Sequence, residues 1–354
     1  MSASALQAFV ELRERLGEAV IGQPAVVEAL LIALLADGHL LLEGLPGLAK
    51  TRAIKALGRE LGLGLARIQF TPDLLPSDLL GAEIYRHDGQ GNGHFVFQPG
   101  PIFAPLVLAD EINRAPAKVQ SALLEAMEER QVTVAGQTHV LPHPFLVMAT
   151  QNPIEHEGTY PLPEAQTDRF LMKVVIGYTE RRLEGEILRL VRAEEGRKLG
   201  SIEHSQTSPP APEHANNATA ATTPAATTVA TSVSSTALHM LGAARQAVST
   251  IYVSPAIEDY LVDLVHATRQ PDPLNAELAR WIDVGASPRG TIALDRCARA
   301  HAWLQGRDFV GPSDVHAVVH ACLRHRLVLS HEALAAGIDA DQVIDRVVAL
   351  VAAP

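Results

Sequence analysis

Residues 44–51 read Gly44-Leu45-Pro46-Gly47-Leu48-Ala49-Lys50-Thr51, and this octapeptide decides the fold. It follows the apolar run at residues 39–42 and precedes a helical pattern, which is the context that a phosphate-binding loop requires. In such a loop, backbone N–H groups and the positive end of the next helix hold phosphate oxygens. Lys50 can then reach the β- and γ-phosphates, and the Thr51 hydroxyl can ligate Mg²⁺. Ala49 replaces the usual final glycine, so the alternative is a glycine-rich turn with an incidental lysine.

A second apolar run, at residues 106–109, ends in two adjacent carboxylates. Asp110 can hold Mg²⁺ through water, and Glu111 can orient and activate an attacking water. Phosphoryl transfer to water needs such a pair, because positioning and charge neutralisation supply nearly all of the catalysis. On its own, a string of this kind most often marks only the solvated end of a strand. Together with the octapeptide, it predicts a site that binds and hydrolyses a nucleotide.

Short apolar runs and helical patterns alternate through the first half of the chain. Buried strands that alternate with helices predict a parallel sheet covered on both faces. Two glycine-rich stretches, around residues 88–93 and 135–137, predict hairpins. The second half carries amphipathic helical patterns and no strand pattern of comparable quality. The predicted fold is therefore an α/β core followed by a helical domain.

Composition limits the function classes. The chain has 354 residues, a formal net charge of −11 and 47% hydrophobic residues. These values allow a large core, exclude global disorder and argue against broad electrostatic binding of nucleic acid. We expect no signal peptide, because the amino terminus has neither a basic start nor an apolar segment. We expect no membrane span, because no apolar run approaches the roughly 20 residues that a spanning helix needs. The two cysteines lack metal-site spacing, so we expect reduced thiols in a cytoplasmic protein.

One segment breaks the pattern of the second half. Among residues 205–236, 25 of the 32 are Ala, Thr, Ser or Pro. Such a composition buries too little apolar surface to offset the entropy of ordering the chain. We therefore expect a disordered insertion within the helical half.

Three further polar residues could complete the site. Asn152 follows a predicted strand and could hold the attacking water, although alone an Asn-Pro turn is the simpler interpretation. Arg169 directly precedes the last predicted strand. Ser287 as N-cap, followed by Pro288, would place Arg289 in the first turn of a helix. Each arginine on its own is more often a surface charge.

These motifs, in this order, resemble AAA+ ATPases and most closely the MoxR family. The shared wording is GLPGLAKT (44–51), ADEINRAP (109–116), ATQNP (149–153), PEAQTDRF (163–170) and GASPR (285–289). Ala49, which departs from the general loop pattern, is the residue that this family tends to use. The resemblance covers nearly the whole chain except residues 203–238 and a small extension around residues 273–284.

The resemblance implies a P-loop NTPase fold of the AAA+ type, in the α/β class, with a parallel-sheet core and a C-terminal all-helical lid domain. The implied boundaries are 1–178 for the AAA+ nucleotide-binding core, 179–202 for the start of the lid, 203–238 for the disordered Ala/Thr-rich insertion and 239–354 for the lid domain. The two hairpins would be the helix-2 insert and the pre-sensor-1 hairpin. Such loops commonly face the central pore of a ring.

The resemblance also implies which residues bind the cofactors, ATP and Mg²⁺. Thr51 and Asp110 would hold the metal, with Asp110 and Glu111 as the Walker B pair. The residues implied to bind ATP are Val20, Ile21, Gly44, Leu45, Pro46, Gly47, Leu48, Ala49, Lys50, Thr51 and Arg52.

Four residues would carry catalysis in the family pattern. Glu111 would activate water, and Asn152 would be sensor 1. Arg169 would be the arginine finger, which reaches the nucleotide of the neighbouring subunit. Arg289 would be sensor 2, which contacts the γ-phosphate from the helical lid.

The implied function is an Mg²⁺-dependent ATPase that forms a homo-oligomeric ring, as a hexamer, and acts as a chaperone-like remodelling or maturation factor. Its partners would be client proteins, often together with a von Willebrand factor A domain protein. The alternative is a nucleic-acid motor or DNA-linked ATPase, as in related clades, but the net charge and the lack of a basic stripe argue against it. A nucleotide-gated scaffold without turnover is a third possibility, which the presence of both Asp110 and Glu111 disfavours.

Overall fold

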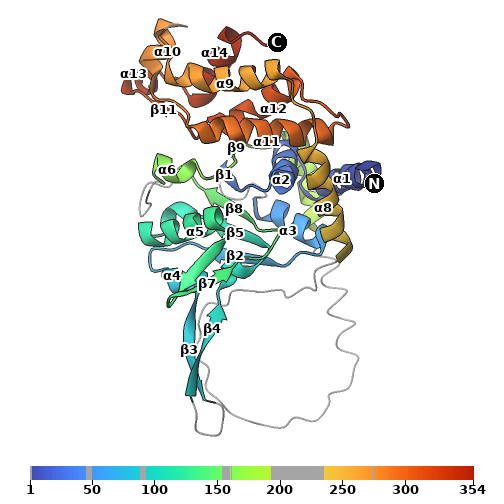
Figure 1. Cartoon of the computed structure of the whole chain (residues 1–354), viewed down its shortest axis with the longest axis vertical. Helices are drawn as coiled ribbons and strands as arrows, with labels where there is room; N and C mark the ends of the chain where they lie inside the picture. Colours follow the sequence, from blue (N-terminus) through green and yellow to red (C-terminus); the bar gives the residue numbers. More distant parts are fainter. Residues whose placement is uncertain are drawn as a thin grey trace.

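The computed structural model describes residues 2–44, 50–87, 93–153, 160, 162–192, 235–272 and 275–354. An α/β core carries a parallel sheet, and the C-terminal helices are stacked on one end of it, at the top of Figure 1. The predicted fold class, a parallel-sheet core with a C-terminal helical domain, is confirmed.

Five parallel strands form the central sheet, in the order β2-β5-β8-β1-β9. They are β1 (Leu40–Gly44), β2 (Leu65–Gln69), β5 (Leu106–Asp110), β8 (Leu146–Gln151) and β9 (Met172–Ile176). Each lies at or next to an apolar run that the sequence predicts as a strand. Because all five run the same way, their carboxyl ends share one edge of the sheet and their amino ends share the opposite edge.

Different helices cover the two faces of the sheet. Leu40 and Leu42 of β1 pack in the cluster that holds α1 (Ser2–Ala19), α2 (Pro24–Leu35) and α3 (Lys50–Leu61). Leu41 packs in the other cluster, with α5 (Ala117–Glu129). This split follows from the alternation of side chains along a strand, and it leaves β1 buried on both sides.

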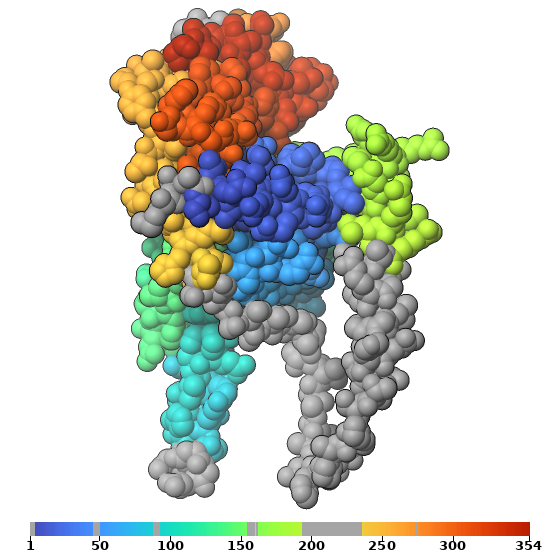
Figure 2. Space-filling view, turned by 90° about the vertical axis from the view of Figure 1, so that its right-hand side faces the viewer, coloured from blue at the N-terminus to red at the C-terminus, as the bar shows by residue number. Residues whose placement is uncertain are grey.

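Both predicted hairpins are present. In the first, β3 (Gly81–His87) pairs with β4 (Gly93–Pro99) and projects from the body of the molecule, beyond α4 (Pro76–Leu80); its tip, at residues 88–92, lies outside the described residues. In the second, β6 (Gln131–Val134) pairs with β7 (Gln137–Val140). The β3–β4 hairpin stands out from the body in both views (Figures 1 and 2). The ring of Phe97 stacks on that of His139 with centroids 3.9 Å apart, so the two hairpins pack against each other.

The second half of the described chain is mostly helical. Its longer helices are α8 (Ser235–Ser249), α9 (Pro255–Arg269), α11 (Pro288–Leu304), α12 (Pro312–Leu323) and α14 (Ala340–Leu350); the shorter ones are α10 (Ala276–Trp281) and α13 (His331–Ala335). A helix also covers residues 181–192. None of the described helices is long and apolar enough to cross a membrane.

Two details differ from the sequence expectations. The short strands β10 (Ile282–Val284) and β11 (Val328–Leu329) pair within the helical half, and they are too short to show a strand pattern. The disordered insertion expected at 203–238 lies outside the described residues up to residue 234, but residues 235–238 begin α8. Ser235 and Thr236 have the same composition as the low-complexity segment before them, so composition placed them in the insertion. Such residues are also common at the start of a helix.

A single hydrophobic cluster joins the lid to the core. It contains Leu31 and Leu34 of α2 together with Leu294 of α11 and Leu264 of α9. Helix α8 returns to the core as well, because Arg245 donates to the Leu34 carbonyl and lies 2.9 Å from a carboxylate oxygen of Asp37. The helical half is therefore packed on the sheet domain and not merely linked to it.

A buried histidine adds an ionic tie between core and lid. His301 on α11 donates from Nδ1 to Asp314, at 2.6 Å, and lies 3.3 Å from Glu28 of α2 through Nε2. The hydrogen bonds to Asp314 and Glu28 raise the pKa of His301 to about 9 against the desolvation cost of burial. The protonated ring can donate from both nitrogens at once, so it bridges the two carboxylates.

This bridge predicts a pH-dependent stability. The pKa of His301 is higher in the folded state than its ordinary value of 6.5, so the stabilisation is complete below that value and is lost as pH rises through about 9. We expect this residue to contribute a loss of about 1–3 kcal/mol in the free energy of unfolding between pH 6 and pH 10. Urea unfolding of the wild type and of His301→Gln measures the difference, with the exposed His331→Gln as control. Identical pH profiles for all three proteins would contradict the assignment.

Candidate functional site

The carboxyl edge of the sheet gathers the residues that the sequence singled out for phosphate and metal binding. Gly44 ends β1, and Lys50, Thr51 and Arg52 open α3. Lys50 donates from Nζ to the Gly44 carbonyl at 2.6 Å, which brings the lysine back to the end of the strand. Leu45, Pro46, Gly47, Leu48 and Ala49 lie outside the described residues. The amino end of α3 carries the positive end of the helix dipole, which favours an anion at this edge.

The turn between α1 and α2 lies at the same edge. Gln23 donates from Nε2 to the carbonyl of Gly177, just beyond the carboxyl end of β9, at 3.1 Å. Ile176 of β9 is opposite Gly44, and a Cβ on Gly44 would lie only 2.8 Å from the Ile176 carbonyl oxygen. Val20 and Ile21 belong to this turn, so they lie on the side of the molecule where β1 ends.

Asp110 and Glu111 meet at the end of β5 and are fixed by Thr150 of β8. The Thr150 hydroxyl donates to Asp110 Oδ1 at 2.7 Å and accepts from the Glu111 backbone N–H at 3.0 Å. Glu111 has a φ of 58°, in the left-handed region that few non-glycine residues adopt. Thr150 therefore holds both the carboxylate of Asp110 and the unusual backbone of Glu111.

Two residues of β2 contact this carboxylate pair, and the sequence did not indicate them. Arg67 lies 2.7 Å through Nη2 from Asp110 Oδ2, and Gln69 donates to Glu111 Oε2 at 2.7 Å. Glu111 also pairs with Arg114 at 3.1 Å. Arg67 and Gln69 are two residues apart on a strand and so share a face, but their partners depend on the register of β2 against β5.

Asn152 lies beside this group. It directly follows the carboxyl end of β8, which lies between β5 and β1, so it is at the same edge as Asp110 and Gly44, and it is 7% exposed. Before it, Gln151 donates to Glu43, whose carboxylate is also 2.7 Å from the Lys173 ammonium. The carboxyl edge thus carries a basic loop lysine, acidic strand ends and amide side chains, which suit a phosphate, a hard cation and a water.

Arg169 and Arg289 lie at the opposite edge. Arg169 precedes β9, and the next residue but one, Leu171, donates from its N–H to the His39 carbonyl at the amino end of β1. Arg169 pairs through Nε with Glu128 Oε2 at 2.9 Å, and Arg289 pairs through Nη2 with the other oxygen of the same carboxylate. A five-residue strand is about 13 Å long, so neither arginine reaches Lys50 in its own subunit. The predicted contact of Arg289 with the γ-phosphate stays a prediction, and its place at the amino edge favours the nucleotide of a neighbouring subunit over that of its own.

Three side chains anchor this arginine pair to both domains. Asp168 accepts from Ser287, the N-cap of α11, at 2.8 Å and pairs with Arg326 at 2.7 Å. The Arg326 side chain is only 3% exposed and also donates to the Phe170 carbonyl at 2.7 Å. The loop that carries Arg169 and the helix that carries Arg289 are thus joined through Asp168.

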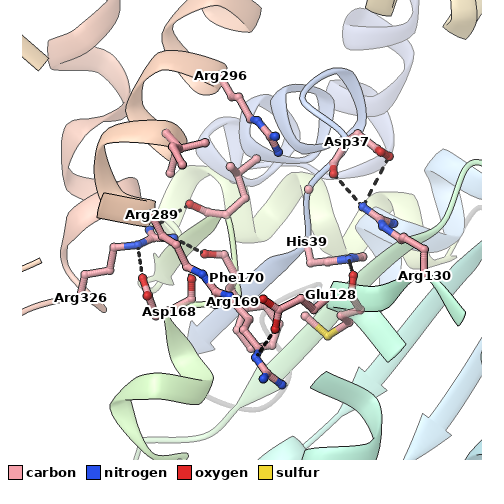
Figure 3. A pocket seen from close by; sticks show the side chains of 15 residues that line it. Asp37, His39, Glu128, Arg130, Asp168, Arg169, Phe170, Arg289, Arg296 and Arg326 are labelled. Carbon is pink, nitrogen blue, oxygen red and sulfur yellow. Dashed lines mark hydrogen bonds and ion pairs between the residues drawn. The ribbon is translucent and has the colours of Figure 1, made fainter. Parts of the chain in front are cut away.

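The arginines line a cavity of about 430 Å³ between α11, α5 and the start of β1 (Figure 3). Its charged lining comprises the five arginines Arg130, Arg169, Arg289, Arg296 and Arg326 and the three acidic residues Asp37, Glu128 and Asp168. The excess of positive charge favours an anionic ligand. Burial lowers the pKa of His39, at the back of this cavity, to about 3, so the ring is neutral. It donates to the Met127 carbonyl and accepts from the Val147 N–H, which is a structural role.

Comparison with known proteins agrees with this geometry. The family model described as "ATPase family associated with various cellular activities (AAA)" matches residues 39–172, and an AAA lid domain model matches residues 277–347. The chain is 45% identical to "Chaperone MoxR1" of Mycobacterium tuberculosis, over 95% of this chain and 79% of that protein. It is 32% identical to "Protein MoxR" of Paracoccus denitrificans, over 91% of this chain and 89% of that protein.

A solved structure matches along the whole length. The crystal structure of a candidate ATPase from Cytophaga hutchinsonii superimposes with a TM-score of 0.82 at 39% identity, covering 100% of this chain and 97% of the other. The similarity therefore includes the sheet, both hairpins and the helical half.

The central hydrogen bonds of Thr150 generate a prediction. Thr150→Val keeps the shape of the side chain but leaves the Glu111 N–H and one Asp110 oxygen without that partner. We expect the free energy of unfolding to fall by about 1–3 kcal/mol and nucleotide turnover to fall with it. Urea unfolding and phosphate release measure the two effects, with Thr133→Val on the exposed hairpin strand β6 as control. Wild-type turnover in Thr150→Val would show that this network does not support the site.

Proposed function

The chain belongs to the MoxR family of AAA+ ATPases, and we propose that it hydrolyses ATP in a ring of identical subunits to remodel or mature partner proteins. One observation carries this proposal. The phosphate- and water-directed residues Lys50 and Glu111 lie at the carboxyl edge of the sheet, while Arg169 and Arg289 lie at the amino edge. Two subunits in head-to-tail contact would bring one edge of each together, and such contacts close into rings.

The carboxyl edge supplies the binding half of the proposed site. Residues 44–52 would hold the triphosphate, with Lys50 on its terminal phosphates and Val20 and Ile21 beside the adenine. Thr51 and Asp110 would hold Mg²⁺, and their hydroxyl and carboxylate oxygens fit that hard cation. When bound, Mg²⁺ neutralises phosphate charge. Asp110 would exchange its contact with Arg67 as the cofactors bind.

Glu111 and Asn152 would serve the attacking water. Glu111 would accept its proton, and Asn152 would orient it as sensor 1. Their places at the ends of β5 and β8, which are neighbours in the sheet, support these two roles. The contact of Gln69 with Glu111 would hold that carboxylate until substrate arrives.

The amino edge supplies the second half, and we assign it to the nucleotide of the neighbouring subunit. Arg169 would act as the arginine finger, as the family pattern implies. Arg289 would act with it and in trans, because both contact Glu128 and neither lies near Lys50. Arginines supplied in this way contribute about 10³–10⁵ to the rate of phosphoryl transfer.

Protein clients are favoured over nucleic acid. The β3–β4 hairpin exposes Tyr85 and Phe95, whose rings lie 5.2 Å apart, and exposed aromatic pairs suit protein contacts. A relative carries the name "Chaperone MoxR1", and the formal charge of −11 opposes a polyanion. We therefore propose a cytoplasmic hexamer acting on client proteins, with a von Willebrand factor A domain protein as partner. Stimulation of the ATPase by DNA would favour the alternative, a nucleic-acid motor.

Domain roles follow the same division. We assign nucleotide binding to residues 1–178 and the lid to residues 179–202 and 239–354, with α8 also supporting the core. Hydrolysis, as opposed to a nucleotide-gated scaffold without turnover, is favoured by the pair Asp110 and Glu111 in one hydrogen-bonded group.

Removing the proposed base separates binding from hydrolysis. Glu111→Gln is expected to bind ATP normally and to lose about 10²–10⁴ in turnover, because the amide cannot accept the proton. Binding of a fluorescent ATP analogue and release of phosphate measure the two properties. Glu125→Gln, on the exposed side of α5, is the control. Near-normal hydrolysis by Glu111→Gln would remove Glu111 from the mechanism.

A finger supplied in trans makes turnover depend on assembly. We expect activity per subunit to rise with protein concentration in step with oligomer formation, and Arg169→Ala to lose about 10³–10⁵ in turnover without losing ATP binding. Phosphate release and light scattering across a dilution series measure this, with the exposed Arg59→Ala as control. If dilute monomer hydrolysed ATP as fast as the assembled protein, the trans role of Arg169 would be wrong.

A further inference from the structure

One carboxylate contacts both arginines of the amino edge. Glu128, near the end of α5, binds Arg169 Nε through Oε2 at 2.9 Å and Arg289 Nη2 through Oε1 (Figure 3). Arg169 belongs to the core loop before β9, and Arg289 to the first turn of the lid helix α11. A single side chain therefore ties the proposed finger to the proposed sensor.

The hydrogen bonds leave both arginines with donors to spare. A guanidinium has five N–H donors in a fixed plane. Arg169 uses its Nε and Arg289 one Nη for Glu128, and neither guanidinium makes another hydrogen bond within the described part of the chain. Each is partly exposed, at 30% and 43% of the side chain, so the remaining N–H groups are accessible to an incoming anion.

Glu128 itself is placed by rigid neighbours. The Met127 carbonyl accepts from the buried His39 ring at 3.1 Å, which ties the end of α5 to the start of β1. On the other side, Arg130 has a φ of 55° and donates to the Asp37 carbonyl at 2.8 Å. These contacts hold the backbone on both sides of Glu128, so its carboxylate extends from a fixed position toward the two arginines that it contacts.

Charge balance also favours this role. Two guanidinium groups on one carboxylate repel each other, and Glu128 offsets that repulsion while keeping the pair together. A terminal phosphate has several oxygens and can bind both guanidinium groups at once. A carboxylate in the same subunit as the arginines would prepare this binding by setting the distance between the two guanidinium groups. Preset donors of this kind need no rearrangement when charge develops.

We propose that Glu128 is a positioning residue for the arginine pair, aligning Arg169 and Arg289 so that their unused N–H groups face the γ-phosphate of the neighbouring subunit's ATP. This inference rests on the proposed function. Glu128 acts through the arginines and contacts neither the phosphate nor the water. Asp168 fixes the backbones that carry the two arginines, whereas Glu128 fixes their side chains.

The test separates positioning from folding. Glu128→Gln keeps the side-chain size but turns an N–H group toward one guanidinium, so we expect kcat of the assembled protein to fall about 10–100-fold. KM for ATP should change less than about twofold, because the binding half of the site lies at the other edge. The thermal midpoint should match the wild type, and Glu128→Asp, which keeps the charge, should recover part of kcat. Glu129→Gln, next along the chain and without an ion pair in the described part of the structure, is the matched control.

Mixing of variants tests the direction of action. Glu128→Gln subunits keep an intact nucleotide half, and Glu111→Gln subunits keep an intact arginine pair. Equimolar mixing under dilution, followed by reassembly, should give more activity than the mean of the two separate proteins, because some interfaces then combine two intact halves. Absence of any gain would show that Glu128 acts on its own subunit's nucleotide and would overturn the proposal.

Arg169→Ala distinguishes the two levels of inference. If Arg169→Ala loses turnover while Glu128→Gln keeps wild-type kcat, the role of Glu128 is wrong and the proposed function stands. If both variants keep wild-type kcat, the trans mechanism fails and the role of Glu128 fails with it. A Glu128→Gln defect that appears equally in kcat, KM and thermal midpoint would indicate a structural role only.

Discussion

The parallel direction of the five strands is the constraint on which the rest of the structure depends. Because β1, β5 and β8 all end at one edge, Gly44, Asp110 and Asn152 come together from segments far apart in the sequence. The same direction sends the loop before β9 to the other edge, with Arg169. A parallel sheet therefore gives the subunit two chemically different edges, one suited to phosphate and metal and one rich in arginine.

Local sequence signals were sufficient for the strands, the hairpins and most helices. Strands such as β5 are buried on both faces and read as unbroken apolar runs, and the glycine-rich turns mark the hairpins. The contacts of Arg67, Gln69 and Glu128 could not be predicted, because each depends on register or packing between distant segments. Gln69 is 42 residues from Glu111, and Arg289 is 161 residues from Glu128. The strands β10 and β11 escaped prediction because two or three residues show no periodicity.

The position of Arg289 shows where a motif read in isolation is incomplete. Its helical context was predicted correctly, since Ser287 caps α11 and Pro288 follows it. The sequence did not show which edge of the sheet this first turn faces. That is set by Asp168, which accepts from Ser287 and pairs with the buried Arg326, so that the lid helix begins beside the loop of Arg169.

Under the proposed trans mechanism, the orientation of the lid would also set the arginine side of the subunit interface. The lid packs on the core through one continuous hydrophobic cluster and through the charged bridge of His301, so it is held to its own core by both apolar and ionic contacts. Arg289, in the first turn of its helix α11, nevertheless lies at the amino edge of the sheet, opposite the carboxyl edge with Lys50 and Asp110. A change in the angle of α11 would therefore alter the spacing of Arg169 and Arg289 before it altered Lys50 or Asp110. Glu128, which contacts one arginine of the core and one of the lid, is where such a change would first be felt, and in the proposed mechanism it would set whether both arginines can bind one phosphate.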